Sequence, residues 1–417
     1  MSKHHQILII GGGTAGLMVA AQLRNKAQNL DIAIVEPSDK HYYQPAWTLV
    51  GAGTFNYKDT IRPEAHYIPS GVKWIKEFAE ELRPDDNKVV LKSGEDLTYD
   101  YLVVCPGIQI NLDALDGLKD TLGKNGVCSN YTDPDYTWKV LQEFKGGTAL
   151  FTQANTPIKC GGAPQKIMYL ADDYLIKTGV RDKSEVTFAA PGGVIFGVKD
   201  FADTLTGIID RKKINTRFGY GLERIDGENK KAYFRLLTDT ATEPDANKGE
   251  VKTDDGLVEV SFDMLHLAPP QSAPDFLRNS KLAIQDGPGK GWVDVDINTL
   301  QHNTFKNVFS LGDVAHLPTA KTGAAVRKQA PVVVDNILEL LRSEKISDHQ
   351  YEGYSSCPLV TGYGKMVLAE FKYNNVRDSD PLLSKFMDTS KESWFLWILK
   401  KYGLPYLYWN KMLRGKM

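Results

Sequence analysis

A glycine-rich segment near the start of the chain constrains its fold more than any other feature. An apolar stretch at residues 7–10 runs directly into Gly11-Gly12-Gly13-Thr14-Ala15-Gly16, and an apolar helical face follows from Leu17. In a G-x-G-x-x-G turn between a strand and a helix, the first glycine permits the turn, the second lets the backbone approach a pyrophosphate, and the third allows close helix–strand packing. A second strand, 31–35, ends on an acidic residue that accepts from a ribose hydroxyl in such sites. We therefore predict a βαβ opening with a dinucleotide site formed by Gly11, Gly13, Ala15, Gly16 and Glu36.

The rest of the chain continues the alternation of strands and helices. Strands are predicted at 88–91, 97–104, 146–152, 186–190 and 305–311. Helices are predicted at 164–177, 201–211 and 322–341, the last interrupted at Pro331, while the polar residues 238–256 are predicted to form a hairpin tip or loop. The fold class is α/β, with two tandem Rossmann-like domains and a C-terminal amphipathic segment. The expected domains are 1–110 with 290–345, then 111–289, then 346–417.

Composition excludes several classes of protein. The 417 residues are 42% hydrophobic and 24% charged, as in ordinary folded proteins. A net charge of −2 gives no basic excess, so we expect no nucleic-acid partner. The four cysteines do not suffice for a disulfide scaffold and form no C-x-x-C pair, so we predict neither a zinc ribbon nor a thioredoxin motif, and no metal site.

A strand at residues 307–313 ends in Gly312-Asp313. It resembles the second FAD signature of flavoproteins with two dinucleotide domains, which implies that Asp313 binds the ribityl chain. The helix from Thr322 would direct its N-terminus at the flavin pyrimidine ring, and Lys321 either adds a charge there or is a solvated lysine. The cofactor is therefore expected to be FAD, and the flavin site is expected to include Gly107, Gly312, Asp313 and Lys321.

A second glycine-rich turn, which would hold a nicotinamide nucleotide, is missing. The strand 148–152 is followed by residues 153–164, which contain no G-x-G-x-x-G and include a cysteine near the start of the next helix. The chain is therefore expected to take electrons from a donor other than NAD(P)H.

Two of the cysteines have distinctive surroundings. Cys160 precedes a helix start and lies beside Lys159 and Lys166, which predicts a lowered thiol pKa. Cys357 lies in a turn-like segment 197 residues further along, and spacing alone does not show that the two meet. We expect Cys105 to be a core residue, and Cys128 to be a bystander with a helper or flavin-linking role left open, so that covalent attachment of FAD is also open.

Residues 159–170 (KCGGAPQKIMYL) and 356–363 (SCPLVTGY) carry a resemblance to a known family. They resemble the two redox-cysteine segments of sulfide:quinone oxidoreductases of the mitochondrial-type branch, within the flavoprotein disulfide reductase superfamily, and the likeness extends along essentially the whole chain. The resemblance implies that Cys160 and Cys357 form a disulfide or a sulfur-bridged trisulfide beside FAD, with Cys357 placed nearer the flavin. It also implies that hydrogen sulfide attacks the pair, that sulfite, glutathione, coenzyme A or another sulfide removes the persulfide sulfur, and that ubiquinone or menaquinone accepts the electrons.

The C-terminus is aromatic and basic. Residues 391–417 contain six basic residues and one acid, and two short amphipathic helices, separated at Gly403 and Pro405, suit insertion into one leaflet of a membrane. The other interpretation is a helical pair that closes a core or a homo-oligomer interface. Phe395 or Trp394 is a candidate to contact the quinone.

Residues 1–6 show no leader and no stretch reaches the length of a membrane span, so the expectation is a peripheral, monotopic protein of the bacterial inner membrane, on a side left open. Three other functions remain open at this point. They are an NADH:quinone oxidoreductase, a flavocytochrome-type sulfide dehydrogenase, and a catalytically silent membrane scaffold that retains FAD.

Overall fold

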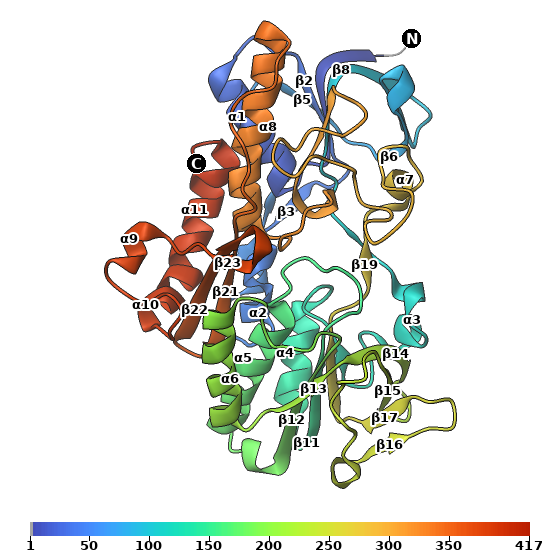
Figure 1. Ribbon diagram of the computed structural model, residues 1–417, viewed down its shortest axis with the longest axis vertical. Helices are drawn as coiled ribbons and strands as arrows, with labels where there is room; N and C mark the ends of the chain where they lie inside the picture. Colours follow the sequence, from blue (N-terminus) through green and yellow to red (C-terminus); the bar gives the residue numbers. More distant parts are fainter. Residues whose placement is uncertain (1–2) are drawn as a thin grey trace.

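The computed structural model describes residues 3–417, and its first layer is a seven-stranded sheet (Figure 1). Five strands are mutually parallel: β1 (Lys3–Ile10), β2 (Ile32–Val35), β5 (Val72–Ile75), β8 (Asp96–Val104) and β20 (Val308–Ser310). β6 (Ala79–Arg83) and β7 (Lys88–Leu91) extend it antiparallel. Every residue of β2 and the last four of β1 are buried, as expected for parallel strands covered on both faces.

A second parallel sheet lies further along the chain. Its five strands are β10 (Val127–Cys128), β11 (Gly147–Thr152), β12 (Ser184–Ala190), β13 (Asn215–Phe218) and β18 (Met264–Leu267). An antiparallel sheet adjoins it, made of β14 (Tyr220–Asp226), β15 (Lys231–Leu236), β16 (Glu250–Lys252) and β17 (Val258–Ser261). The polar stretch 238–256 is mostly loop, but its end forms β16, because residues 250–252 pair with β17. The α/β class is confirmed; the predicted domain limits stay predictions.

Helices cover both parallel sheets. They are α1 (Thr14–Lys26), α2 (Trp47–Val50), α3 (Leu118–Thr121), α4 (Pro134–Glu143), α5 (Ala163–Lys177), α6 (Lys199–Lys212), α7 (Asp275–Arg278) and α8 (Gly323–Ser343). Two small strand pairs link the layers: β3 (Lys40–Tyr42) with β4 (Ile61–Pro63), and β9 (Gln109–Ile110) with β19 (Gln271–Ser272). α1 and α8 lie side by side in Figure 1 and share one apolar core.

The interruption predicted at Pro331 is wrong, because α8 continues through it. Proline removes one backbone donor from a helix, which is destabilising. Around it, however, Ala330, Val332, Val333 and Val334 are all fully buried, and this apolar packing keeps the helix together.

The C-terminal part begins with an antiparallel sheet of β21 (Ser355–Gly362), β22 (Lys365–Lys372) and β23 (Val376–Arg377). Cys357 therefore lies on a strand, not in the predicted turn, and faces Ala369 of β22. The proline that follows it suggested a turn, but β21 pairs on one edge only, where a missing N–H is tolerated.

The last helices follow: α9 (Pro381–Ser384), α10 (Trp394–Ile398), a π-helical turn (Leu399–Gly403) and α11 (Leu404–Asn410). The break predicted at Gly403 and Pro405 is wrong, because helical backbone runs from residue 394 to 410. The Leu404 N–H bonds to the carbonyl of Leu399, five residues back, and this wider turn accommodates the glycine and proline.

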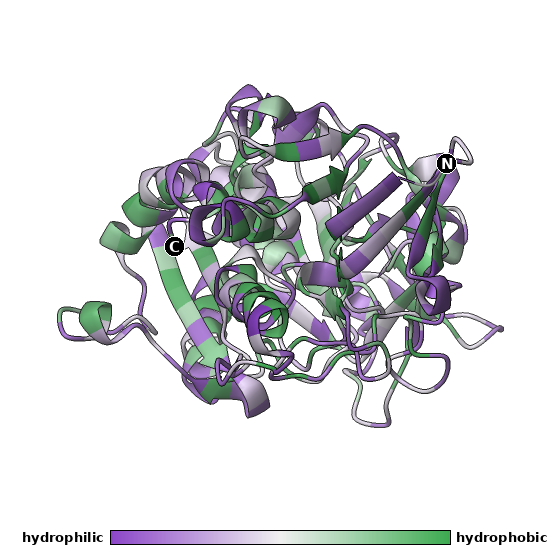
Figure 2. Ribbon diagram, turned by 90° about the horizontal axis from the view of Figure 1, so that it is seen from above, coloured by the Kyte–Doolittle hydropathy of each residue, from purple (hydrophilic) through white to green (hydrophobic). Residues whose placement is uncertain are grey.

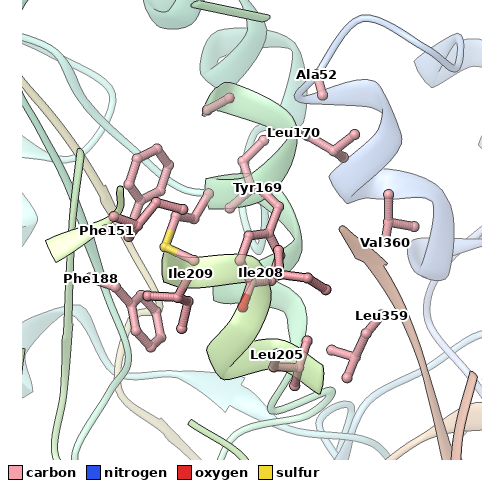
Figure 3. Close-up of a cluster of buried hydrophobic side chains, with 14 of the residues drawn as sticks. Ala52, Phe151, Tyr169, Leu170, Phe188, Leu205, Ile208, Ile209, Leu359 and Val360 are labelled. Atoms are coloured by element: carbon pink, nitrogen blue, oxygen red, sulfur yellow. The ribbon is translucent and has the colours of Figure 1, made fainter. Parts of the chain in front are cut away.

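One large apolar core joins the second sheet to the C-terminal sheet. Phe151 and Phe188 on the strands meet Leu205, Ile208 and Ile209 of α6. Tyr169 and Leu170 of α5 lie between this layer and Leu359 and Val360 of β21 (Figure 3). This core places α5, which begins just after Cys160, directly against β21, which contains Cys357.

Candidate active site

The glycine-rich turn has the geometry that a dinucleotide requires. Gly11 adopts φ +104°, and a Cβ there would lie 2.5 Å from the carbonyl oxygen of Cys105. A Cβ on Gly16 would lie 1.9 Å from the carbonyl oxygen of Gly11, so the helix can approach the turn only with glycine at this position. At Gly13 nothing lies within 4 Å of an added Cβ. The turn is therefore open at Gly13, and no side chain caps the start of α1 there, which suits a phosphate.

The predicted acid closes this turn. Glu36 follows β2, and its carboxylate accepts hydrogen bonds from the N–H groups of Gly12 and Ser38, both at 2.8 Å. Ala15 is buried in the first turn of α1, and Gly107 has φ +77° with no atom within 4 Å of an added Cβ. The predicted residues thus lie around the carboxyl ends of β1 and β8, where nucleotides bind in such sheets.

The second half of the cofactor site lies at the end of β20. Gly312, at φ +75°, donates its N–H to Gln329 at 2.9 Å, and Asp313 follows beside the start of α8. Burial raises the pKa of Asp313, while the positive charges of Lys159 and Lys321 oppose this rise. Burial lowers the pKa of Lys321 to about 8; its amine donates to the Ala315 carbonyl and lies 4.0 Å over the Trp292 ring. Lys321 is therefore not a solvated lysine.

Cys160 lies directly beside this helix start. Its N–H donates to the carbonyl of Lys321 at 2.8 Å, and its own carbonyl accepts from Ala163, the first residue of α5. The residue adopts φ +50°, a left-handed conformation that is uncommon for a residue with a side chain. Strained backbone of this kind is concentrated at functional sites.

The two cysteines predicted to pair do meet. Cys357 packs against Gly162, two residues after Cys160, so closely that a Cβ on this glycine would lie 2.4 Å from the Cys357 sulfur. A hydrogen bond from Cys357 lowers the pKa of the Cys160 thiol well below its usual range, and Lys166 adds to this effect. The same bond and burial raise the pKa of Cys357. Negative charge is therefore favoured on Cys160 over Cys357.

Two buried lysines supply positive charge at the pair. The Lys166 amine lies 3.0 Å from the Cys160 sulfur, with 2% of the residue exposed. Burial opposes its charge, but the two sulfurs outweigh burial, so the pKa of Lys166 is raised. Lys400, also 2% exposed, donates to the carbonyl of Pro45 at 2.8 Å. Burial, together with repulsion from Lys166, lowers its pKa to about 7.

The comparisons with known proteins identify the family. Residues 5–139 match the family model of pyridine nucleotide-disulphide oxidoreductases. The chain is 44% identical to the mitochondrial sulfide:quinone oxidoreductase of Dictyostelium discoideum, over 99% of this chain and 86% of that one, and 41% identical to the one of Mus musculus, over 99% and 87%. It belongs to the sulfide:quinone oxidoreductase family.

A solved structure supports the fold of this family member. The sulfide:quinone oxidoreductase of Aquifex aeolicus superposes with a TM-score of 0.79 at 21% identity, over all of this chain and 92% of that one. The chain is accordingly an FAD-binding flavoprotein, and the open turn at Gly13, the acid Glu36 and the start of α8 beside Asp313 fit that cofactor.

The predicted bacterial inner membrane is wrong for this family member. Its relatives from Dictyostelium discoideum, Mus musculus and Schizosaccharomyces pombe are all named as mitochondrial. The prediction weighed only the first six residues, of which 1–2 lie outside the described range. A targeting signal is not part of the folded domain, so it carries no information about the family, whereas identity along the whole chain does.

The other predicted residues fall into two groups. Cys105 and Cys128 are buried, and burial raises the pKa of both thiols, that of Cys128 to about 12, so both have the character of core residues. Trp394 and Phe395 lie on the outside of α10 with 67% and 51% of their surface exposed. That Trp394 or Phe395 contacts the quinone stays a prediction from the sequence.

Sequence reasoning missed Lys400 and Tyr408. Lys400 was counted only among the six basic residues of 391–417, and the π-helical turn that rotates it inward has no recognisable signal in the sequence. The Tyr408 hydroxyl forms hydrogen bonds with the Thr14 hydroxyl (2.7 Å) and with Nε2 of His41 (2.6 Å). The other ring nitrogen of His41 bonds to the Glu64 carboxylate (2.9 Å). These contacts tie the C-terminal helix to the glycine-rich turn.

Proposed function

We propose that this protein oxidises hydrogen sulfide at Cys160 and Cys357 and passes two electrons through FAD to a membrane quinone. The observation that carries the proposal is the meeting of the two sulfurs, from positions 197 residues apart, beside the start of α8. The names of the relatives with 41–44% identity support the substrate and the acceptor.

The cysteine residues perform thiol–disulfide exchange. Hydrosulfide attacks one sulfur of the oxidised Cys160–Cys357 pair; a new S–S bond forms, the bond between the cysteines breaks, and one cysteine leaves as a thiolate. A thiol of lower pKa leaves faster, and Lys166 stabilises negative charge on Cys160, so attack at Cys357 is favoured. Which sulfur lies nearer the flavin stays a prediction.

A small nucleophile (sulfite, glutathione, coenzyme A or another sulfide) then takes the outer sulfur and leaves a second cysteine thiolate. Return of the two thiolates to the disulfide releases two electrons. When bound, FAD supplies a two-electron acceptor that a quinone, ubiquinone or menaquinone, reoxidises. The residues of this chain hold it by the turn at Gly11–Gly16, by Glu36, and by Asp313 with the start of α8.

Anaerobic titration tests the proposal. Sulfide should bleach the flavin absorbance of the purified protein, and NADH should not, because residues 153–162 between β11 and α5 form no glycine-rich turn. Cys160→Ala and Cys357→Ala should each retain FAD and lose sulfide-dependent quinone reduction by orders of magnitude. Bleaching by NADH would favour an NADH:quinone oxidoreductase, and full activity in either variant would refute the cysteine mechanism. A flavocytochrome-type enzyme would reduce a haem partner and not a quinone.

We also propose that an aromatic surface around the C-terminal helices binds a membrane. Side chains that are at least half exposed gather there: Leu382, Phe386, Trp394, Phe395, Tyr402 and Tyr406. Seen from above, the short helix α9 projects from the body on the side of the C-terminus (Figure 2). Aromatic side chains beside lysines suit the interface of a bilayer. No helix within residues 3–417 is long and apolar enough to cross one.

Flotation with anionic lipid vesicles checks this surface. Serine at Trp394, Phe395, Tyr402 and Tyr406 should remove most vesicle binding and leave sulfide-dependent flavin bleaching intact. Serine at Phe78, which is 55% exposed outside this surface, provides a matched control. Unchanged flotation of the fourfold variant would favour a homo-oligomer interface, which gel filtration would then show.

A further inference from the structure

Helix α5 and strand β21 meet at both of their ends. At one end Gly162, which precedes α5, touches the Cys357 sulfur. At the other end the carboxylate of Asp173 accepts the backbone N–H of Tyr363, just after β21, at 2.8 Å. From Gly162 to Asp173 a helix rises roughly 16 Å, and from Cys357 to Tyr363 a strand spans roughly 20 Å. The two contacts therefore fix the position of the strand along the helix.

The contacts at the Asp173 end are close and specific. A Cβ on Gly362 would lie 2.3 Å from a carboxylate oxygen of Asp173, so the acid rests against bare backbone. The Tyr363 hydroxyl donates to the carbonyl of Ala52 at 2.8 Å, which holds the same turn from its other side. The residue after β21 is thus held by two hydrogen bonds.

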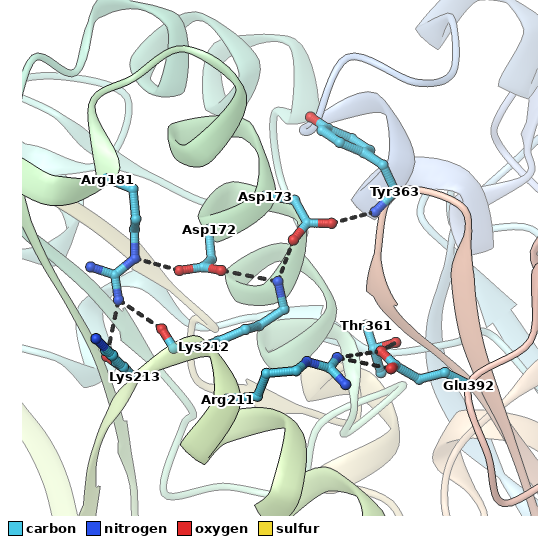
Figure 4. A network of polar contacts seen from close by, with 9 residues as sticks. All are labelled: Asp172, Asp173, Arg181, Arg211, Lys212, Lys213, Thr361, Tyr363 and Glu392. Carbon is cyan, nitrogen blue, oxygen red and sulfur yellow. Dashed lines mark hydrogen bonds and ion pairs between the residues drawn. The ribbon is translucent and has the colours of Figure 1, made fainter.

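A buried charge network holds Asp173 itself (Figure 4). Lys212 of α6, whose side chain is 7% exposed, pairs with both Asp173 and Asp172. Asp172 is fully buried and also pairs with Arg181 at 2.5 Å. Asp173, whose side chain is 21% exposed, is thus held by a buried lysine that the fully buried Asp172 holds in turn.

The apolar contacts between α5 and β21 cannot set this position alone. Tyr169 and Leu170 pack against Leu359 and Val360 (Figure 3), but apolar packing is not directional. A slip of one residue would move Cys357 by roughly 3.3 Å and turn it to the other face of the strand. The hydrogen bond from the Tyr363 N–H to Asp173 is directional, and it ties the end of β21 directly to α5.

We propose that Asp173 is a positioning residue for the cysteine pair. It fixes β21 along α5, and it thereby holds the Cys357 thiol where it donates to Cys160, beside Lys166 of the same helix. This inference rests on the proposed function of the two cysteines, and it assigns Asp173 a role although it contacts neither sulfur.

The test measures the thiolate of Cys160 in the FAD-loaded, full-length protein after reduction. Alkylation by iodoacetamide is followed across pH, with the Cys160 peptide quantified by mass spectrometry. Loss of the Cys357 hydrogen bond should raise the apparent pKa of Cys160, and Cys357→Ala gives the full size of that shift. Asp173→Ala should raise the pKa part of the way, by about one unit. Asp173→Asn keeps an oxygen that accepts from Tyr363 and should stay near wild type.

Two further variants make the result decisive. Asp203→Ala, which removes an exposed acid on α6 that pairs with Lys199, should leave the profile unchanged. Gly362→Ala keeps the charge of Asp173 but pushes it from Tyr363, so it should reproduce the shift even if Asp173→Ala does not fold. Wild-type profiles in Gly362→Ala and in folded Asp173→Ala would overturn the inference. The measurement needs neither sulfide nor quinone, so failure of the proposed function would be seen separately, in the flavin titration.

Discussion

At the scale of single residues, three interactions act on the sulfur of Cys160. The Cys357 thiol donates a hydrogen bond, the Lys166 amine lies 3.0 Å away, and the charge of Lys400 adds to both. The sequence indicated the lysine at 166 and the lowered thiol pKa, because both follow from a cysteine near a helix start. It did not indicate Lys400, which arrives from 240 residues further along the chain.

Lys400 makes the stability of the protein depend on pH. Its pKa is about 7 in the folded state against 10.5 for an unburied lysine, so between these values the unfolded chain binds one more proton. Stability therefore rises with pH across this window, by about 3 kcal/mol from pH 7 to 9.5 for a group of this shift. Lys400→Met lacks this pH-dependent contribution to stability.

We therefore expect the thermal midpoint of Lys400→Met, relative to wild type, to be highest near pH 7 and to fall by pH 9.5. Differential scanning calorimetry of the two flavin-loaded proteins measures this difference. Lys401→Met serves as the control, because Lys401 is next to Lys400 in the sequence but is not buried. A difference that does not change with pH would show that Lys400 keeps its charge throughout.

At the scale of elements, α11 is attached to the glycine-rich turn by one hydroxyl group. Tyr408 bonds to Thr14 and to His41, and its ring lies 4.7 Å from that of Tyr43. Trp409 packs beside it, 5.1 Å from Tyr67 and 4.5 Å from Arg62. The sequence predicted two short amphipathic helices here, which either insert into a membrane leaflet or close a core, and the inner face of this segment is part of the apolar core around α1 and α8.

Tyr408→Phe should loosen this attachment. Loss of the hydroxyl removes the partner of the buried Nε2 of His41, and also a hydrogen bond to the partly buried hydroxyl of Thr14, which costs about 1–3 kcal/mol. We expect a thermal midpoint lower by a few degrees and faster tryptic cleavage after Lys411. Tyr406→Phe, which is 59% exposed on the same helix, is the matched control. Equal cleavage rates in the two variants would contradict the role of Tyr408.

At the scale of the whole molecule, the C-terminal segment has two opposite faces. Trp394, Phe395, Tyr402 and Tyr406 point outward, while Leu396, Trp397, Tyr408 and Leu413 are buried against the rest of the protein. The chain end is also fixed to α1, since Gln22 donates to Met417 and Asn25 to Arg414. One segment thus closes the core and exposes an aromatic surface, so the two sequence-based interpretations of it are compatible.

Removal of residues 391–417 should therefore not give a well-folded soluble protein. It would uncover the apolar core around α1 and α8 and remove Lys400 from the cysteine pair. We expect a truncated protein that aggregates or melts well below wild type, whereas the fourfold serine variant of the aromatic surface melts near it. Thermal melting with gel filtration distinguishes the two; a truncated protein as stable as wild type would show that the segment is only an anchor.

Local patterns determined much of this protein. The glycine turn, Glu36, the Gly312-Asp313 strand end and the missing second glycine turn are readable from sequence, because each depends on residues that are neighbours along the chain. The parallel strands and most helices follow from apolar periodicity for the same reason. The two cysteines were paired only through resemblance to a family, since no local rule relates positions 160 and 357.

Only the tertiary structure decided which distant groups share a site. It brought Cys357 to Cys160 by packing β21 on α5, turned Lys400 inward through a π-helical turn, and carried α8 unbroken through Pro331. In each case burial of apolar surface and contacts between distant residues outweighed the local preference of a proline, a glycine or a charged side chain. Such contacts have no signature within a short window of sequence, so they were determined only when the whole chain had folded.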